Sequence, residues 1–600
     1  MPDCSAGADA PPQFTPSDEM PVSAFRQILW LPLRRTLAMS AIDQPEVDGA
    51  RRWVRFDGDP LRAADHPSTP GRPQDLYAHY LYFHPYIRRF LFDLPPGDQR
   101  PLTLWRLRDP QQFAWLDVVL PEGQDAKGGG VYALRFRVER CLLYEFSLGL
   151  VLLELELVWQ ESRHPSDGTA PRPPLSLAEV MDTLDFMRRT HPGYFPWAPA
   201  EAPPHRRLDL IGGRFPLAAR WSKHDHFMAT PEIDLGDDVT RQDDLLKRLG
   251  ERREAFLDKV LNLPATRCIT PLGEPWASLL GQVGEHCEQI EDERMPYMAY
   301  VVVDDPARIW RGDWVRLASA DYRGKSAELP YGEAMLHAFE QSHCYDRFFD
   351  PKAGLTTRYL NTGYAFAMVG ANIPVFTGDL LVHFRRHYAS IGLLAQFNKA
   401  ALLLFSNRLS EAIETRNQGD GSAYRNQVRH IQGDLLEFTH RYWFDGVSNQ
   451  LQAGELQAMW FKHLRLNDLY AAVMAEARAA HDYVIAEEQR LQTLEEQHQS
   501  AEQRYQTVQI NALTEGALYV AVLGLILAAM GAGFPIDKPL SLIHEASTKA
   551  SCWVWAAGCT VDWWRTIPGV AAALGAAAVS YQLCKLISRA RTSRASSTKP

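Results

Sequence analysis

The longest run of apolar positions in the chain lies near its C-terminus. Residues Gly516 to Phe534 read GALYVAVLGLILAAMGAGF, nineteen positions without a charge. At ~1.5 Å per residue, a helix of this length crosses a hydrocarbon core of ~30 Å. A buried helix of a soluble domain is rarely apolar over such a length, so the pattern predicts a transmembrane helix over residues 513–535.

A second apolar stretch follows over residues 567–587. It is richer in Ala and Gly, and its end is polar, with Ser580, Tyr581, Gln582 and Lys585. Small residues allow helices to pack closely in lipid. The pattern favours a second transmembrane helix, and an interfacial or buried hairpin helix is the alternative interpretation.

Residues 467–512, ahead of the first span, contain neither Pro nor Gly. Two sets of residues recur there at seven-residue spacing: Val484, Leu491, His498 and Tyr505, and in the complementary position Leu494, Ala501 and Val508. This is a coiled-coil seam with His498 and Glu487 as flaws. The spacing predicts a stalk helix of about 65 Å. No breaker separates it from the first span, so we expect stalk and span to form one rod that carries motion of the soluble part to the membrane.

Residues 25–370 mix strand and helix patterns. From Val151 to Val158 every second residue is apolar, with Glu154 and Glu156 in between, which is the period of a strand. Breaks near residues 139–140 and 147–149 predict a meander of two or three strands. Ser176 forms a capping box with the Glu three residues later and opens a helix to about residue 189.

Further strands are predicted over residues 297–303 and as a pair over residues 357–370. The fold class is therefore a mixed α/β N-terminal domain over residues 25–370, followed by a helical subdomain over residues 371–466. Residues 1–24 and about 160–175 are rich in Pro, Ser and Gly and are expected to be disordered. The aromatic stretch over residues 77–90 is expected to pack in the core.

The formal net charge of −10 argues against a nucleic-acid partner, because such binders present a basic face. The tail 588–600 carries only basic charges: Arg589, Arg591, Arg594 and Lys599. Basic residues beside a span stay in the cytoplasm. Two spans then place both termini there, which agrees with an N-terminus that lacks an apolar signal sequence. We expect a multi-pass protein of the plasma (inner) membrane, with a cytoplasmic N-terminal domain and an extracytoplasmic loop over residues 536–566.

Eight cysteines scattered over 600 residues are no disulfide framework. Cys552 and Cys559 differ from the others because they fall in the predicted outer loop. A disulfide between them in an oxidising compartment and two free thiols on a short interfacial helix are equal alternatives.

The layout resembles that of the CorA-type divalent-cation channels. The resemblance rests on a mixed domain, a charged stalk that continues into the first of two spans, a basic tail and the segment TRYLNTGYAFAMVG at residues 357–370. It implies a homopentamer in the lipid bilayer, a pore lined by the first span, and Mg²⁺ as the transported or regulatory ion, with no tightly bound cofactor. The family's Gly-Met-Asn at the outer end of that span is replaced here by Met530-Gly531-Ala532-Gly533-Phe534, and the outer loop is longer.

Polar residues at the ends of the first span are candidates for an ion pathway. Asn511, Thr514 and Glu515 lie at its inner end, and in a pentamer Glu515 would form a ring of five carboxylates. The alternative is that Glu515 is simply the last solvated residue of the stalk. Gly531 and Gly533 could expose carbonyl oxygens at the outer mouth, or could mark a plain helix end.

Other clusters of potential metal ligands also have a purely structural interpretation. His383 and His387 share a helix face, but the arginines between them favour surface histidines over a metal site. The dipeptides at residues 286–287 and 343–344 (His-Cys) could supply metal ligands only if folding brings them together. The acidic run at residues 285–293 could hold Mg²⁺ or form a solvated helix face.

No P-loop, nucleophile elbow or zinc-protease motif is present in the sequence, so an enzyme has no positive support. We therefore expect a CorA-like channel or transporter for a divalent metal cation. The alternative is a membrane-anchored sensor or effector, whose soluble domain binds a ligand or protein and signals through the stalk.

Overall fold

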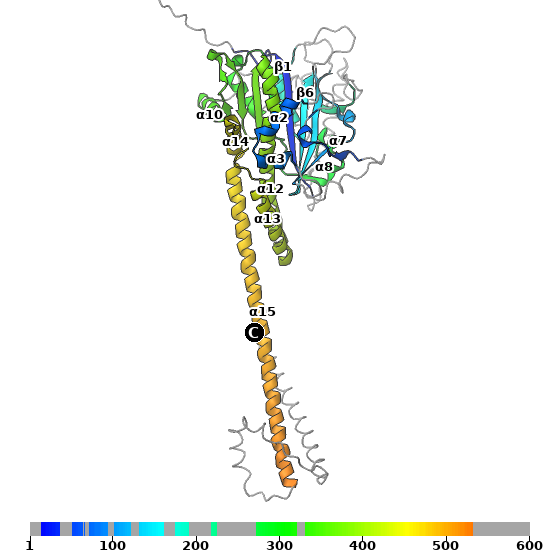
Figure 1. Ribbon diagram of the computed structural model, residues 1–600, viewed down its shortest axis with the longest axis vertical. Helices are drawn as coiled ribbons and strands as arrows, with labels where there is room; N and C mark the ends of the chain where they lie inside the picture. Colours follow the sequence, from blue (N-terminus) through cyan, green and yellow to red (C-terminus); the bar gives the residue numbers. More distant parts are fainter. Residues whose placement is uncertain are drawn as a thin grey trace, which may run out of the picture. The chain divides into compact units, whose positions relative to one another are not determined.

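The computed structural model describes residues 14–35, 51–63, 65, 71–93, 101–121, 131–160, 174–190, 218–224, 272–320 and 331–531. The chain divides into two compact units, Met1–Asp482 and Tyr483–Pro600. The first unit contains a mixed sheet with helices on both faces. The second contains most of one long helix (Figure 1).

The strands have the following bounds: β1 Val22–Arg35, β2 Trp53–Arg55, β3 Leu102–Leu107, β4 Trp115–Pro121, β5 Val131–Phe146, β6 Leu150–Gln160, β7 Ala218–Ser222, β8 Cys287–Gln289, β9 Tyr297–Val303, β10 Cys344–Tyr345, β11 Phe349–Asp350, β12 Leu355–Thr356, β13 Arg358–Asn361 and β14 Ala365–Ala371. The α-helices are α2 Pro73–Tyr82, α3 Pro85–Leu91, α4 Leu177–Met187, α7 Trp276–Leu280, α8 Gln282–His286, α9 Arg311–Ser319, α10 Glu333–His343, α11 Leu381–His383, α12 Ala389–Asn417, α13 Gly421–Arg441, α14 Leu451–His463 and α15 Leu466–Gly531. Two π-helical turns, η6 Phe376–Leu380 and η7 Phe384–Tyr388, flank α11, and short 3-10 turns occur at Pro60–Arg62, Pro110–Phe113, Pro306–Arg308 and Pro351–Ala353.

The main sheet runs in the order β10-β13-β14-β9-β1-β6-β5-β3-β2. Its pairs are antiparallel except for β14 beside β9, which is parallel. The long strand β5 also pairs with β4, which continues to β7, and β8 adds to the end of β1. This confirms the coarse fold class: a mixed-sheet N-terminal domain followed by long helices.

The side chains of strand β6 alternate between the two faces of the sheet. Leu153, Leu155 and Leu157 point into an apolar core that also contains the inner faces of α4, α7 and α9. Glu154 and Glu156 point to the opposite face, and both are buried as well, at 1% and 0% exposure. The alternation predicted the strand; the structure adds that its polar side is also buried.

The second face of the sheet is covered by helix α12, which crosses β1 and β6 (Figure 1). A Cβ added at Gly392 would lie 2.7 Å from the indole of Trp30 and 3.3 Å from the sulfur of Met298. Residues 376–417 are apolar and long enough to cross a membrane, but 78% of their most apolar window is buried. We therefore interpret this segment as a core helix of the domain.

Glycine at position 392 is required by this close approach. Gly392→Ala is expected to lower the free energy of unfolding by about 1–3 kcal/mol, because the methyl group overpacks the contact with Trp30. Gly433→Ala on α13 is the matched control, since nothing lies within 4 Å of its added Cβ. There the change is expected to raise stability by about 0.5–1 kcal/mol. Denaturant titration of both variants checks the opposite signs, and equal effects would contradict the close packing.

Several sequence predictions are confirmed locally. Ser176 and Glu179 form the capping box of α4, with both reciprocal hydrogen bonds present. The predicted strand over residues 297–303 is β9, and the pair over residues 357–370 is β13 and β14. The break near residue 139 is a bulge within β5 rather than a strand end, whereas Gly149 turns the chain with a φ of 82°.

The expectation of disorder over residues 1–24 is wrong for residues 14–24. Thr15 bridges Ile309, and Met20 is 2% exposed. Val22 begins β1, whose register with β9 contains a bulge at this end. Apolar side chains among the Pro and Ser residues hold this segment on the domain. The predicted disorder around 160–175 falls largely on residues 161–173, outside the described part of the chain.

Candidate functional site

Helix α15 contains the predicted stalk and most of the predicted first span, up to Gly531. It runs from Leu466 to Gly531 without interruption, which corresponds to about 100 Å at ~1.5 Å per residue. Its most apolar window is long enough to cross a membrane, and 0% of this window is buried. Leu518 and Leu525 are 53% and 73% exposed. An apolar segment of this length that no protein surface covers requires another apolar environment.

The predicted pathway residues lie on or beyond this helix. Asn511, Thr514 and Glu515 are exposed side chains of α15. The Thr514 hydroxyl donates a hydrogen bond to the carbonyl oxygen of Ile510, at 2.7 Å, so its proton is already used within its own helix. Gly531 is the last residue of α15.

The remaining predictions for the membrane region lie outside the described residues. They are Gly533, the cysteines Cys552 and Cys559, the outer loop 536–566, the second span 567–587 and the basic tail 588–600.

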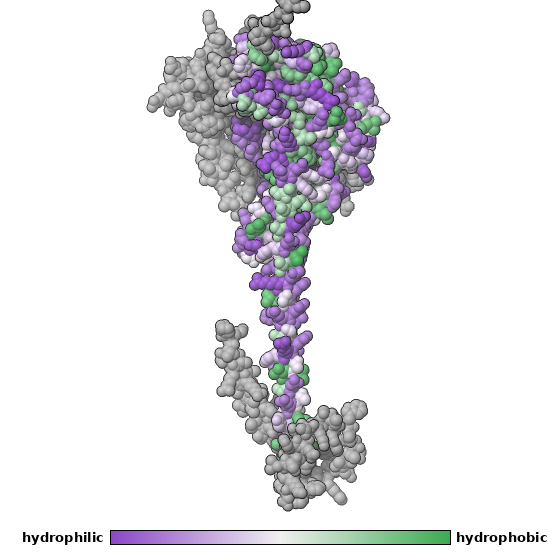
Figure 2. Space-filling model, turned by 90° about the vertical axis from the view of Figure 1, so that its left-hand side faces the viewer, coloured by the Kyte–Doolittle hydropathy of each residue, from purple (hydrophilic) through white to green (hydrophobic). Residues whose placement is uncertain are grey.

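The heptad positions of α15 from Leu491 onward form an exposed seam, whereas Val484 is buried, at 2% exposure. Leu491 and Leu494 are 39% and 43% exposed, and Tyr505 and Val508 are 56% and 65% exposed. Figure 2 shows apolar side chains interspersed among the polar ones along this helix. Apolar residues at this spacing are buried when helices pair in a coiled coil.

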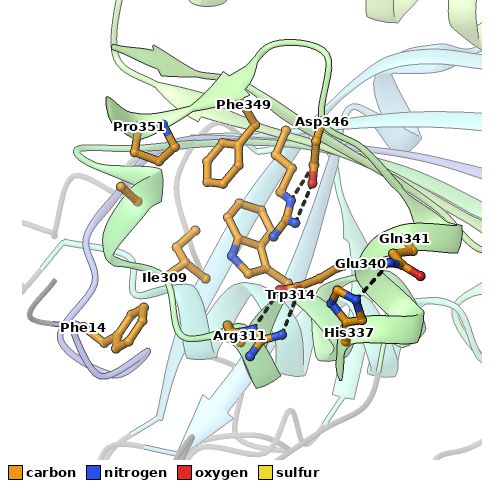
Figure 3. A pocket seen from close by; sticks show the side chains of 12 residues that line it. Phe14, Ile309, Arg311, Trp314, His337, Glu340, Gln341, Asp346, Phe349 and Pro351 are labelled. Carbon is orange, nitrogen blue, oxygen red and sulfur yellow. Dashed lines mark hydrogen bonds and ion pairs between the residues drawn. The ribbon is translucent and has the colours of Figure 1, made fainter. Parts of the chain in front are cut away.

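The first unit contains a pocket of about 410 Å³ between α9, α10 and the turns before β13 (Figure 3). Trp314 of α9, at 2% exposure, forms part of its wall and lies edge-on to Phe349, at 5.7 Å between ring centroids. Phe14 from the N-terminal segment and Ile309 contribute to the apolar wall. The volume of the pocket lies within the range of small-molecule sites, about 300–1,000 Å³.

Two arginine–carboxylate pairs supply the charged groups of the pocket, and His337 and Gln341, hydrogen-bonded to each other, add further polar ones. Arg358 donates from Nε and Nη2 to Asp346, at 2.7 and 2.8 Å, and its guanidinium lies over the rings of Trp314 and Phe349, at 5.0 and 4.8 Å. Arg311 donates to Glu340 from Nε and Nη2, at 2.9 and 2.7 Å. The hydrogen bonds from Arg311 lower the pKa of Glu340, so this pair is ionised at neutral pH.

A second polar cluster lies between the sheet and η7. Glu156 accepts hydrogen bonds from Arg26, from Arg140 at 2.9 Å and from Arg385 at 2.6 Å. Burial alone would raise the pKa of Glu156, but the three guanidinium charges outweigh it and hold the pKa far below its ordinary value. Every acid of this cluster is hydrogen-bonded to or ion-paired with an arginine. The cluster therefore links η7 to the sheet, and none of its acids is available as a catalytic base.

The interpretation of His387 as a surface residue is wrong. His387 is 3% exposed, because its ring stacks on Tyr82 of α2 at 4.2 Å and lies 5.5 Å from the ring of His79. His383, one turn earlier, is only partly buried. Packing of α2 on η7 covers this face of the helix, which the sequence spacing does not reveal.

The other candidate ligand groups do not converge. His286 and Cys287 lie at the end of β1, whereas His343 and Cys344 lie at the edge strand β10, several strands away. The acidic run is divided between α8, β8 and a turn, so it is no single helix face. Within the described part of the chain, no group of three or more His, Cys, Asp or Glu residues is placed to hold a metal ion.

The buried histidine predicts acid sensitivity. Burial, His383 and Arg386 lower the pKa of His387 to about 3, while the carbonyl of Ala78 and Asp75 act in the opposite direction. A histidine in the unfolded chain takes up a proton near pH 6.5, and the folded state does not, so stability is present at neutral pH and falls as the pH drops.

Between pH 6.5 and pH 4 the contribution of His387 to the loss of unfolding free energy is expected to be on the order of 3 kcal/mol. Burial also lowers the pKa of the neighbouring His79 well below its ordinary value, so His79 adds a loss of its own. His387→Gln should therefore reduce the total loss by about the share of His387, whereas His430→Gln, at an exposed position of α13, should leave it unchanged. Denaturant titrations at the two pH values check this. If the His387 variant loses as much stability as the parent protein, the acid sensitivity arises elsewhere.

The sequence did not reveal the pocket. Its lining residues come from the N-terminal segment, α9, α10 and the turns around β11, and they form no motif. Phe14 falls in a stretch expected to be disordered, and Arg358 within a predicted strand. Only the tertiary fold brings these side chains together.

Comparisons with protein-family models, curated proteins and solved structures found no match for this chain.

Proposed function

We propose that the chain is an oligomeric integral membrane protein of CorA-like layout, with α15 as both stalk and first span. The observation that carries this proposal is the continuity of α15, a single helix whose polar part leads into an uncovered apolar part. A helix satisfies its own backbone hydrogen bonds, as a bilayer requires. The mixed-sheet domain is then cytoplasmic, and the predicted second span and basic tail complete a multi-pass topology in the plasma (inner) membrane.

The heptad register supports a role for Glu515 at the inner mouth. Counting seven residues from Leu494 through Ala501 and Val508 leads to Glu515, so this carboxylate continues the seam that faces the oligomer axis. Because α15 has no break between these residues, the register is maintained. A ring of such carboxylates attracts cations to a pore entrance. Asn511, one turn earlier, adds a second polar group near the same end.

We therefore propose divalent-cation conduction, with Mg²⁺ as the first ion to test. Full-length protein in liposomes that contain a Mg²⁺-sensitive dye is expected to admit Mg²⁺, and Glu515→Gln to slow the influx by at least about fivefold. Glu502→Gln, an exposed position outside the seam, serves as the matched control. A well-folded oligomer without flux, or a Glu515 variant that conducts like the parent, would refute the pathway.

The pocket favours a second function, that of a membrane-anchored sensor. A cavity of about 410 Å³ with ionised groups and aromatic walls lies in the domain that α15 carries. In this function a ligand that binds in the pocket shifts the domain between two conformations, and α15 transmits this conformational change to the membrane. Ligand binding without any ion flux supports the sensor, whereas flux that no pocket variant affects supports the channel alone.

A further inference from the structure

The pocket between α9 and α10 has two chemically different sides (Figure 3). Phe14, Ile309 and Phe349 lie on one side, and Glu340 and Asp346 lie on the other. A ligand that fills the space meets a hydrocarbon surface at one end and carboxylates at the other. The pocket therefore selects molecules that combine an apolar body with a polar head.

The arginines and carboxylates of the lining balance in charge. Arg311 and Arg358 contribute two positive charges and Glu340 and Asp346 two negative ones, while Glu333 bonds Arg311 from outside the lining. The guanidinium of Arg311 donates from Nε, Nη1 and Nη2 to its two carboxylates. An incoming anion would have to compete with these bonds, whereas a cation finds carboxylate oxygens that can accept further hydrogen bonds.

The exposure of the side chains in the pocket also favours a cationic ligand. The side chain of Asp346 is 40% exposed, whereas that of its partner Arg358 is 6% exposed. The acid therefore faces the open space, and the arginine lies behind it against the aromatic rings. Phe14, at 39% exposure, leaves part of its ring uncovered on the opposite wall.

Arg358 shows within the protein how a cation uses this surface. Its planar guanidinium packs over Trp314 and Phe349 while it forms two hydrogen bonds with Asp346. Attraction between a cation and aromatic faces strengthens when the pair is shielded from water. The remaining faces of Phe14 and Phe349 and the free lone pairs of Asp346 offer a second cation the same combination.

We propose that the pocket binds a small organic cation, in which an amidinium, guanidinium or ammonium head joins an apolar body. The head lies at Asp346 and Glu340, and the body lies against Phe14 and Phe349. The inference rests on the sensor function and names the ligand class of that site.

Three probes of equal shape test the charge preference: benzamidine, benzamide and benzoate, which are cationic, neutral and anionic. Calorimetric titration of the full-length protein in detergent is expected to show binding of benzamidine at least about tenfold tighter than that of benzamide, and no binding of benzoate. Benzamide that binds as tightly as benzamidine, or benzoate that binds more tightly, overturns the proposal.

Variants locate the binding. Asp346→Asn is expected to weaken benzamidine binding at least about tenfold, and Phe14→Ala at least about threefold. Glu333→Gln is the control, because Glu333 is 78% exposed and bonds Arg311 from outside the lining. The affinity of this variant for benzamidine should stay within about twofold of the parent value. If Asp346→Asn fails to fold, Phe14→Ala decides, since this exposed ring is not part of the core. Unchanged affinity in Phe14→Ala overturns the site.

The outcomes are separate from those of the membrane proposal. A membrane oligomer that does not bind benzamidine refutes the pocket and leaves the span intact. A chain that binds benzamidine but remains monomeric in solution without detergent refutes the span and leaves the pocket intact.

Discussion

Replacing Glu156 by alanine is expected to lower the free energy of unfolding by about 3–5 kcal/mol. Glu156 is fully buried and accepts hydrogen bonds from Arg26, Arg140 and Arg385. Removal of the carboxylate leaves three guanidinium groups without their shared acceptor in a site shielded from water. The cost of such uncompensated buried charge exceeds that of losing an apolar contact of similar size.

Denaturant titration of the full-length protein in detergent measures this change. Glu414→Ala, at an exposed position of α12, is the matched control and is expected to change stability by less than about 0.5 kcal/mol. Comparable losses of unfolding free energy in both variants would mean that the charge cluster does not stabilise the packing of η7 on the sheet.

Two aspartates in the apolar part of α15 are expected to abolish its insertion into a membrane. Leu523 and Leu525 are 45% and 73% exposed and lie near the middle of the predicted span. On an insertion scale, two Leu-to-Asp changes at a helix centre cost about 6–8 kcal/mol. The double variant Leu523→Asp, Leu525→Asp should therefore fail to translocate the residues that follow.

A glycosylation acceptor placed in the loop 536–566 reports on this translocation when the chain is synthesised with microsomes. We expect efficient glycosylation for the parent sequence and almost none for the double variant. Gln497→Asp with Gln499→Asp, two exposed positions of the polar part, should leave glycosylation unchanged. Glycosylation of the Leu523, Leu525 variant at the parent level would contradict insertion of this segment.

Local features of the fold were predictable because they depend on neighbours in the sequence. The alternation around Glu154 predicted β6, Ser176 predicted the start of α4, and the absence of Pro and Gly predicted the long helix α15. Each of these signals reflects backbone geometry and hydrogen bonds within a few residues.

Features that depend on distant partners were not predictable. The acids of β6 read as one polar side of a strand, but Glu156 is buried because Arg26 and Arg385 reach it from 130 and 229 residues away. His387 read as a surface residue because α2, which covers it, lies about 300 residues earlier in the sequence. The pocket depends on the same kind of long-range assembly.

The candidate pathway could be named from the sequence only as far as residue types allow. Asn511, Thr514 and Glu515 stand out as polar groups at the edge of an apolar run, and α15 gives them a shared helix and register. Their roles depend on neighbouring subunits, because a single helix encloses no pathway.

Cysteine accessibility in liposomes tests the central claim that α15 crosses the bilayer. Single cysteines are placed along the helix, for example at Gln497, Gln503, Leu518 and Leu525, in a full-length variant in which the eight native cysteines are replaced. A maleimide that cannot enter lipid is expected to label positions 497 and 503 rapidly and to leave 518 and 525 unlabelled until detergent is added. Equal labelling at all four positions before detergent is added would contradict a membrane-spanning helix.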